Sequence, residues 1–346
     1  MAQGASANLT GILADAFPQV LNSTAIPIVA KNRPFLHMIL GKPVPPQGID
    51  PSMMDKQPNL PNFERLTRLD GNQVELRLLG TVDEPQFVGM TTAEQFTPVA
   101  PNYTEKRFSA KFNIAQVVYV YDVPMVKLKQ VAGDAAKCGS FLKEEAVATA
   151  NGIEQFLARA VNSNGDATDK TVTGWRLPLG GATGSYLNID LSDAGNVDFV
   201  AQQHNVNGTM NFKHIMNAQS LSWNAGGDVD FAVCNITDYQ GIAQIVEGKF
   251  VPTTNDQQWR QFGGRYLQVR GTQYLLDNYH ATSGTIAYMD SRQIAAWMGI
   301  DGFTAQGMSR NNQVLSGNRM FIDMWFQWIM KNNQFNVRQY GITAFA

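Results

Sequence analysis

The amino-acid sequence predicts a mixed α+β fold, and three features of the 346-residue chain lead to that prediction. Nine of its 15 prolines lie before residue 67, where they interrupt any long helix or strand. Residues 134–161 repeat apolar side chains at spacings of three and four, which predicts one long amphipathic helix. Residues 166–298 then alternate helix and strand patterns, and an aromatic strand pattern follows near the end of the chain.

Residues 1–66 are predicted to form an extended, irregular arm. The prolines exclude long regular elements, but apolar residues remain frequent, which is not typical of a disordered tail. We therefore expect the arm to lie across another surface.

Residues 67–113 are predicted to form a long two-stranded loop. Asn72–Leu79 alternates polar and apolar residues as a half-buried strand does, and Lys106–Asn113 is the expected return strand. An isolated hairpin is only marginally stable in water, so this one should need a neighbour such as another subunit. Its charged side chains are candidates for salt bridges between subunits, and a solvated edge that repels aggregation is the alternative. These candidates are Arg77, Glu84, Glu94, Glu105, Arg107 and Lys111.

The next segment is predicted to contain a short strand at 116–121, a short helix and the long helix. Asp122 is expected to cap the short helix, with Pro124 in its first turn and its end near Gly133. The long helix at 134–161 should run about 40 Å at a rise of about 1.5 Å per residue. Its expected buried stripe consists of Ala135, Cys138, Leu142, Ala146, Thr149, Ile153, Phe156 and Ala160.

The remaining elements are predicted from local patterns and capping residues. A helix at 212–222 should follow a cap at Thr209 or Asn211, and Thr237 should cap a helix at 238–247. The patterns predict strands at 230–234, 266–270 and 285–289, a short helix from Ser291 to Trp297, a long aromatic strand at 320–331, and a return segment at 335–345.

Composition limits the classes of function that the chain can have. Hydrophobic residues make up 44% of the chain, enough for a sizeable core, whereas charged residues make up only 16%. A surface so poor in charge suggests that much of it is covered, either by self-assembly or by a large ligand. The formal net charge of −2 leaves no basic excess for a polyanion, which argues against sequence-specific DNA binding.

No motif predicts a catalytic, cofactor-binding or metal site. The four histidines are scattered without metal-ligand spacing, and the two cysteines cannot form a zinc site. The glycine-rich stretch at 179–185 lacks the Lys–Ser/Thr ending of a phosphate-binding loop. The most apolar stretch, 321–330, is about half the length of a membrane span and contains Asp323 and Gln327, so no membrane anchor is expected.

Four stretches together follow the order of a known family. They are Asp122-Val-Pro with the long helix and its turn at 162–165, the segment 231–239, the segment 262–271 running to 284–290, and the strand from Met320 with the ending 336–345. In this order the chain resembles the major capsid proteins of tailed bacteriophages, whose fold is named after phage HK97. The resemblance covers essentially the whole chain, and it rests on the joint order because no single stretch is a catalytic signature.

The resemblance implies how the chain is divided into the parts of the HK97-like fold. These parts would be an N-terminal arm at 1–66, an extended β-hairpin loop at 67–113, a peripheral domain with the spine helix at 114–165, an axial α+β domain at 166–298, peripheral β strands at 299–335 and a C-terminal return to the axial domain at 336–346.

The resemblance also implies a structural protein of the virion, with no enzymatic activity and no cofactor. Copies would assemble in the cytoplasm of a host bacterium into hexamers and pentamers of an icosahedral shell around double-stranded DNA. The chain begins almost directly with the arm, which would imply a separate scaffolding protein, or none. A portal protein and, as an optional partner, a cement or decoration protein would complete the particle.

Two other functions stay open at the level of sequence. An encapsulin-like nanocompartment uses the same fold to enclose a cargo enzyme, so the nature of the enclosed cargo would separate it from a virus. A soluble α+β enzyme is disfavoured because the sequence has no acid–base, nucleophile or metal pattern. A compact monomer in solution would favour the enzyme interpretation again.

Overall fold

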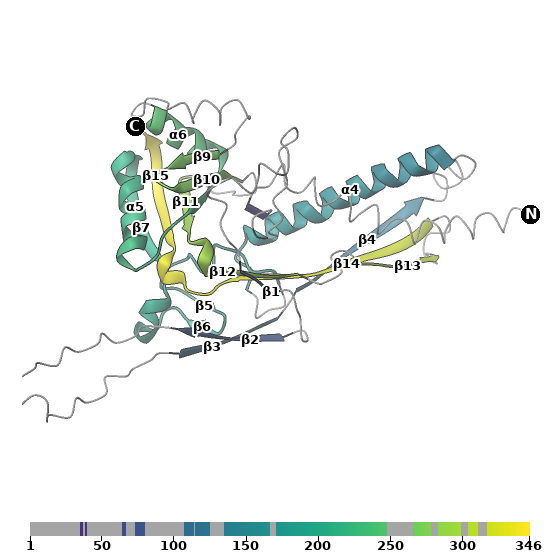
Figure 1. Cartoon of the computed structure of the whole chain (residues 1–346), viewed down its shortest axis with the longest axis horizontal. Coiled ribbons are helices and arrows are strands. Elements are labelled where there is room, and N and C mark those ends of the chain that lie inside the picture. Colours follow the sequence, from purple (N-terminus) through teal and green to yellow (C-terminus); the bar gives the residue numbers. More distant parts are fainter. Residues whose placement is uncertain are drawn as a thin grey trace, which may run out of the picture.

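A computed structural model of the chain describes residues 35–36, 39, 64–66, 73–79, 107–113, 115–124, 135–166, 171–247, 266–277, 283–298, 304–310 and 317–346. In these residues the chain forms two large β sheets, two small two-stranded sheets and helices that pack on or extend from them (Figure 1). The predicted mixed α+β class is confirmed.

The larger sheet has six strands in the order β7-β15-β11-β8-β10-β9. Its strands are β7 (Gln202–Met210), β8 (Phe231–Cys234), β9 (Tyr266–Val269), β10 (Thr272–Leu276), β11 (Thr285–Met289) and β15 (Val337–Phe345). Every residue of β8 and β11 is buried, which explains why these central strands are apolar runs without polar alternation. The strands predicted at 230–234, 266–270 and 285–289 are confirmed within one residue at their ends.

Two helices, α5 (Phe212–Asn224) and α6 (Ile236–Glu247), pack against this sheet and share one apolar core with it. Asn211 caps α5, because its side chain accepts hydrogen bonds from the backbone of the first turn; it is one of the two caps that the sequence predicted. The cap predicted for α6 was wrong. The helix begins before Thr237, and Asn235 Oδ1 accepts a hydrogen bond from the Asp238 N–H at 2.8 Å.

The second sheet is built around β14 (Gly317–Met330), the long aromatic strand that the sequence predicted. β4 (Ala115–Pro124) pairs with one edge of β14, and β12 (Ile294–Met298) and β13 (Thr304–Arg310) pair with the other edge. β1 (Glu64–Leu66) continues the sheet parallel to β12.

This sheet corrects two predicted helices. Asp122 and Pro124 lie in β4 instead of starting a helix, because the strand continues opposite β14 until Pro124 reaches Gly317. Only residues Ser291–Gln293 form the short helix η4, and the rest of the expected helix is β12. In both places the pairing with β14 outweighs a local helix-start signal. The rest of the predicted short helix, towards Gly133, lies outside the described residues.

The long helix is α4 (Ala135–Val161), as predicted, and it projects away from the six-stranded sheet in the same direction as β4 and β14 (Figure 1). Its buried stripe is only partly the expected one. Thr149 and Ile153 are buried, but the stripe continues through Leu157, and Phe156 is 56% exposed. A sequence pattern with steps of three and four allows both continuations, and contact with the rest of the protein selects between them.

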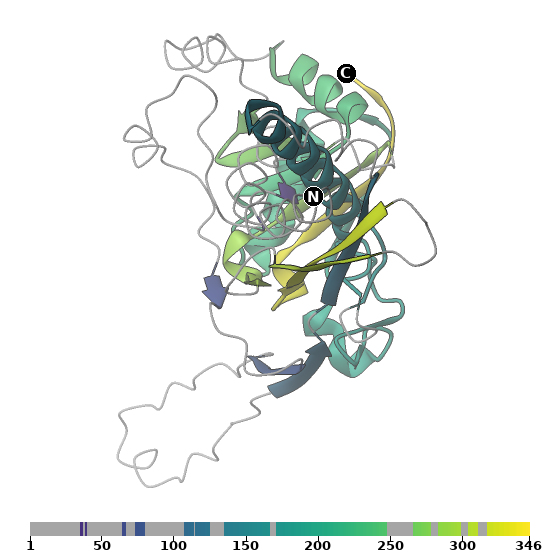
Figure 2. The same ribbon diagram turned by 90° about the vertical axis from the view of Figure 1, so that its right-hand side faces the viewer.

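The predicted hairpin is confirmed as β2 (Gln73–Leu79) paired with β3 (Arg107–Asn113) in an antiparallel ladder. Both views place it at one end of the molecule, beyond the two large sheets (Figures 1 and 2). A second small hairpin joins β5 (Ser185–Tyr186) to β6 (Ile189–Asp190) through two residues with positive φ, which is the geometry of a type I′ turn. The short helix η3 (Ala194–Phe199) follows it.

Three residues of the predicted arm belong to the core of this same chain. Phe35, Leu36 and Ile39 are at most 1% exposed. The Phe35 ring lies 6.2 Å from that of Phe231 and 5.8 Å from that of Trp328, so it sits between the two large sheets. Part of the arm is therefore anchored on its own subunit, and the remainder of residues 1–63 lies outside the described residues.

Candidate functional site

Three of the six predicted contact residues lie in the described part of the hairpin. The backbone register places Arg77 opposite Ser109, Leu79 opposite Arg107, and Glu75 opposite Lys111. Glu84, Glu94 and Glu105 lie outside the described residues, and the role of all six in subunit contacts stays a prediction.

The hairpin is fixed to the body of the protein through the fully buried side chain of Gln327 in β14. Gln327 Nε2 donates to the Asn113 carbonyl at the end of β3 (2.9 Å) and to the Thr171 carbonyl (2.8 Å). Its Oε1 accepts from the Thr173 N–H at 2.9 Å. One neutral side chain thus joins the root of the hairpin, the central strand of the second sheet and the segment after α4. We call this the hairpin joint.

A second joint lies at the end of α4, and we call it the helix joint. Asn162 Nδ2 donates to the Ala158 carbonyl (2.9 Å) and to Asp277 Oδ2 after β10 (3.1 Å), and its Oδ1 accepts from Trp175 Nε1 (2.7 Å). Asn162, Trp175 and Asp277 are each at most 4% exposed. The turn at 162–165 that ends the long helix is therefore fastened to the six-stranded sheet.

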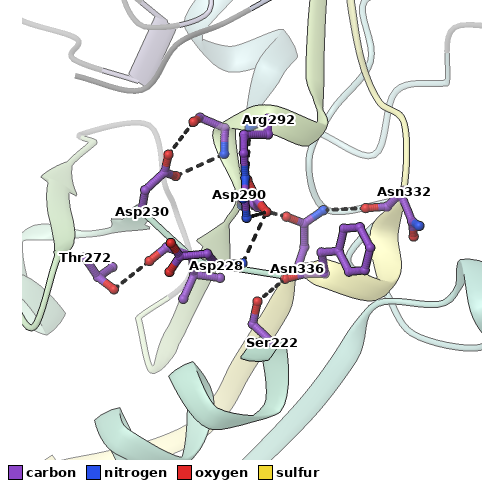
Figure 3. Close-up of polar contacts among 11 residues, drawn as sticks. Ser222, Asp228, Asp230, Thr272, Asp290, Arg292, Asn332 and Asn336 are labelled. Carbon is purple, nitrogen blue, oxygen red and sulfur yellow. Dashed lines mark hydrogen bonds and ion pairs between the residues drawn. The ribbon is translucent and has the colours of Figure 1, made fainter. Parts of the chain in front are cut away.

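A third joint lies where two segments of the chain cross from one large sheet to the other. The first crossing runs from β11 through η4 to β12, and the second runs from β14 through η5 (Asn333–Phe335) to β15. Figure 3 shows that the side chains at the two crossings point toward each other. The Asp290 N–H donates to Asn336 Oδ1 at 2.9 Å, which ties the first crossing to the second. We call this group the crossover joint.

The crossover joint gathers several further backbone groups around Asp290, which is fully buried. Its carboxylate accepts from the Asp228 N–H (3.2 Å), from the Arg292 N–H (3.0 Å) and from the Arg292 guanidinium (2.7 and 2.9 Å), so the charge is paired. The ion pair reaches the surface, because the Arg292 side chain is 59% exposed. Ser222 Oγ at the end of α5 donates to the Phe335 carbonyl at 2.6 Å and adds the helix layer to the joint (Figure 3).

Asp230 is the most perturbed carboxylate of the crossover joint. Burial raises its pKa above the ordinary value for aspartate, and hydrogen bonds from the Ser291 hydroxyl and N–H oppose that rise. A neighbouring negative charge on Asp290 adds to the rise. The charged form of this carboxylate is consequently less stable in the folded protein than that of an exposed aspartate.

The described residues contain no cluster of three or more His, Cys, Asp or Glu side chains that could hold a metal ion. The fold does bring His204 and His214 together, with ring centroids 5.8 Å apart, a proximity that their spacing in the sequence did not predict. The Asn211 N–H donates to His214 Nδ1 at 3.2 Å, so this ring completes the cap of α5. Cys234 is a buried free thiol, as expected for a core residue.

Sequence reasoning missed all three joints. Gln327 appeared in it only as a polar residue that argues against a membrane span. A lone glutamine inside an aromatic strand is a usable signal, because a buried amide must find partners for both its donor and its acceptor. Asn162 and Asn336 follow structural elements and resemble ordinary helix-end or turn residues. The neighbouring sequence therefore does not indicate their long-range hydrogen-bond partners.

No protein-family model matches the chain, and no curated protein matches it by sequence. Among the helices that the structure describes, none has the length and apolar character needed to cross a membrane.

Solved structures show clear similarity of fold. A chain of the cyanophage A-1(L) capsid asymmetric unit matches with a TM-score of 0.58 and 9% identity, over 81% of this chain and 90% of that chain. A chain from the capsid of a native GTA particle matches with a TM-score of 0.56 and 10% identity, over 90% of this chain and 98% of that one. A chain of Mycobacterium phage Bobi matches with a TM-score of 0.51 and 16% identity, over 80% and 88%. The chain therefore has the mixed α+β fold of phage capsid chains.

Proposed function

We propose that this protein is the major capsid protein of a tailed, double-stranded DNA virus. Many copies would assemble as hexamers and pentamers into an icosahedral shell. The observation that carries the proposal is the match to the cyanophage capsid chain over 90% of that chain's length, which leaves little of the capsid fold without a counterpart here. At 9% identity the match supports the fold directly and the function by inference.

The hairpin supports a role in assembly on physical grounds. Among the described strands, β2 and β3 pair only with each other, and the hairpin is tied to the body at the Asn113 end of β3. A two-stranded ribbon of this kind is marginally stable in water by itself. In a shell it would lie on a neighbouring subunit, where the charged residues Arg77, Arg107 and Lys111 would meet complementary groups. Glu84, Glu94 and Glu105 are proposed as contacts of the same kind.

The charge of the chain suits a wall around DNA. With a formal net charge of −2, the protein has no basic excess that would bind the packed genome tightly or select a sequence. The contents would be held by enclosure. The proposal includes a separate scaffolding protein and a portal as assembly partners, a cement or decoration protein as an optional one, and no cofactor or enzymatic step.

The test is to express the full chain alone, treat the lysate with nuclease, and collect fast-sedimenting material for negative-stain electron microscopy. Uniform shells or rings of five and six copies support the proposal, and nuclease-protected DNA inside particles from infected cells supports the viral role. Shells that enclose a host enzyme instead of DNA would indicate an encapsulin-like compartment. Protein that stays monomeric at all concentrations, also when co-expressed with the neighbouring genes of its source genome, would refute the proposal.

A further inference from the structure

Three asparagine–glycine pairs occur in the chain, and this dipeptide is prone to spontaneous deamidation. The pairs are Asn151–Gly152, Asn164–Gly165 and Asn207–Gly208. In this reaction the backbone nitrogen that follows an asparagine attacks the carbon of the side-chain amide, and glycine hinders the approach least because it has no side chain. The reaction needs a backbone that adapts, so it is suppressed where neighbouring structure holds the chain in place. The fold places the three pairs in three different settings.

The first two pairs are held by the structure around them. Asn151 and Gly152 lie inside α4, where each backbone N–H of the helix interior donates to the carbonyl four residues earlier. The Gly165 N–H donates to Ser163 Oγ at 2.9 Å. A Cβ added to Gly165 would overlap the Val172 carbonyl oxygen, so this glycine is also closely packed. In both pairs the nitrogen that would attack is engaged in a hydrogen bond.

The third pair lies in an irregular part of β7. This strand pairs with β15 in parallel, and the register runs from Asn205 opposite Tyr340 to Gly208 opposite Ile342. Because β7 takes three steps where β15 takes two, Asn207 lies in a β-bulge between two paired positions. Its φ of 49° is in the left-handed region, which asparagine tolerates better than most residues, and Gly208 follows with a φ of 145°.

The surroundings of the bulge are open. Asn207 is exposed, and a Cβ added to Gly208 would have no atom within 4 Å. β7 is an edge strand of the six-stranded sheet (Figure 1). Asn205 Oδ1 accepts from the Asn207 N–H at 3.1 Å, which holds the nitrogen before the Asn207 side chain and not the one after it. The Asn207–Gly208 link therefore has room to change its conformation.

We propose that Asn207–Gly208 is a site of spontaneous deamidation and that the fold protects the other two pairs. The Gly208 nitrogen loses its proton and bonds to Asn207 Cγ. The bond from Cγ to the side-chain nitrogen breaks, and that nitrogen takes up a proton and leaves as ammonia. Water then opens one of the two C–N bonds of the cyclic imide, which gives aspartate or isoaspartate. The net reaction consumes one water and involves no oxidation or reduction.

The product changes both the charge and the backbone of the edge strand. β7 (QQHNVNGTM) contains no aspartate or glutamate, so the new carboxylate is its first negative charge. Isoaspartate also adds one carbon to the main chain at the bulge. Charges and bulges are features that keep edge strands from pairing with further strands. Deamidation at this position therefore makes β7 a poorer template for edge-to-edge aggregation.

The test compares the three pairs within one molecule. Unassembled full-length protein is incubated at neutral pH, either folded or unfolded in urea, and peptide mass spectrometry measures the conversion of amide to carboxylate at each asparagine. The rate of each pair in the folded protein is divided by its own rate in urea. We expect this ratio to be at least about tenfold larger for Asn207 than for Asn151 and Asn164, and we expect isoaspartate among the products.

A pair of variants gives a second readout by isoelectric focusing of the whole protein. Asn207→Gly removes the reactive amide and suits the positive φ, and Asn164→Gly is the matched control at another exposed asparagine. We expect Asn207→Gly to slow the appearance of acidic species at least about threefold and Asn164→Gly to leave it unchanged.

Three outcomes would overturn the proposal. Equal ratios at Asn164 and Asn207 would mean that the fold does not select the site. A ratio at Asn207 as small as that at Asn151 would mean that the bulge is as protected as the helix. Aspartate without isoaspartate would mean that water hydrolyses the amide directly. The proposal does not depend on the shell function, so none of these results bears on whether the chain forms shells.

Discussion

Gln327 should be the most sensitive single position for the attachment of the hairpin. Replacing it with methionine keeps the length of the side chain and removes the amide. The buried N–H groups of Thr173 and Trp328 would then lose the amide oxygen, and the carbonyls of half-buried Asn113 and exposed Thr171 would lose the amide nitrogen. Each unsatisfied buried group costs about 1–3 kcal/mol, neighbouring losses are not fully additive, and water can reach the two carbonyls, so the expected total is about 2–4 kcal/mol.

The assay for this prediction has a global and a local part. Urea unfolding of unassembled subunits, followed by circular dichroism, gives the loss of unfolding free energy. Hydrogen–deuterium exchange of the peptides that contain β3 and Thr173 shows whether the loss is located at the hairpin joint. Gln244→Met, at an exposed position of α6, is the matched control and should change the unfolding free energy by less than about 0.5 kcal/mol.

A loss below about 1 kcal/mol for Gln327→Met would refute the reasoning, since it would mean that water or another group satisfies the freed backbone. Unchanged exchange at β3 together with a large global loss would refute the local part. In that case Gln327 would contribute to the sheet core and not to the attachment of the hairpin.

Three further predictions concern the other joints, each measured by urea unfolding of unassembled subunits. Asn162→Leu should destabilise the protein by about 2–4 kcal/mol, because it leaves the buried Asp277 carboxylate without its amide donor; a loss under about 1 kcal/mol would argue against the helix joint. Asp230→Asn should change the pH dependence of stability. Since burial raises the folded-state pKa of Asp230, the folded protein takes up this proton first, and the unmodified protein should gain stability relative to the variant as the pH falls from 7 to about 4; the opposite trend would contradict the assignment. Gly174→Ala should cost about 2–3 kcal/mol, because the added Cβ would lie 1.9 Å from the Ser163 carbonyl oxygen, and a neutral result would show that the turn at 162–165 opens easily.

The sequence predicted the elements whose signal is repeated along many residues. In each of these elements the same pattern of residue types is repeated along the whole element. The examples are the aromatic run of β14, the amphipathic period of α4 and the apolar runs of β8 and β11. Such elements bury an apolar face, and the period of the pattern alone predicts which residues form that face, whatever element packs against it. The order of these elements was also sufficient to find the resemblance that the comparisons of structure bear out.

The predicted helix start at Asp122 and the predicted helix cap at Thr237 each rested on one or two local residues, and both were wrong. Asp122 followed by Pro124 is a valid start signal for a helix, but its value is about 1 kcal/mol. Pairing with β14 extends through both residues and contributes a hydrogen-bonded ladder and cross-strand contacts at each step. Thr237 failed for a smaller reason, since Asn235 two residues earlier is an equally good cap.

The joints could not be predicted because their partners are distant along the chain. Gln327 and Thr173 are separated by 154 residues, and Asn162 and Asp277 by 115. A local pattern shows that a polar residue occupies an apolar surrounding, but it does not show which backbone groups will face that residue once the sheets have crossed. The candidate contact residues of the hairpin were selected by charge alone, which explains why the selection did not include any of the buried amides.

The three joints share a chemical design that connects them with the low charge of the chain. Gln327, Asn162 and Asn336 each accept one or two hydrogen bonds through the amide oxygen and donate one or two through the amide nitrogen. A carboxylate can only accept, and a lysine can only donate, so neither could link a donor on one segment to an acceptor on another. Burying an amide also costs less than burying an unpaired charge, and its hydrogen bonds are not weakened by salt. In the proposed shell around DNA and its counterions, we expect these amide hydrogen bonds to hold the hairpin, the long helix and the two sheets in the same relation as the ionic strength changes, also where an amide pairs with a buried carboxylate, as Asn162 does with Asp277.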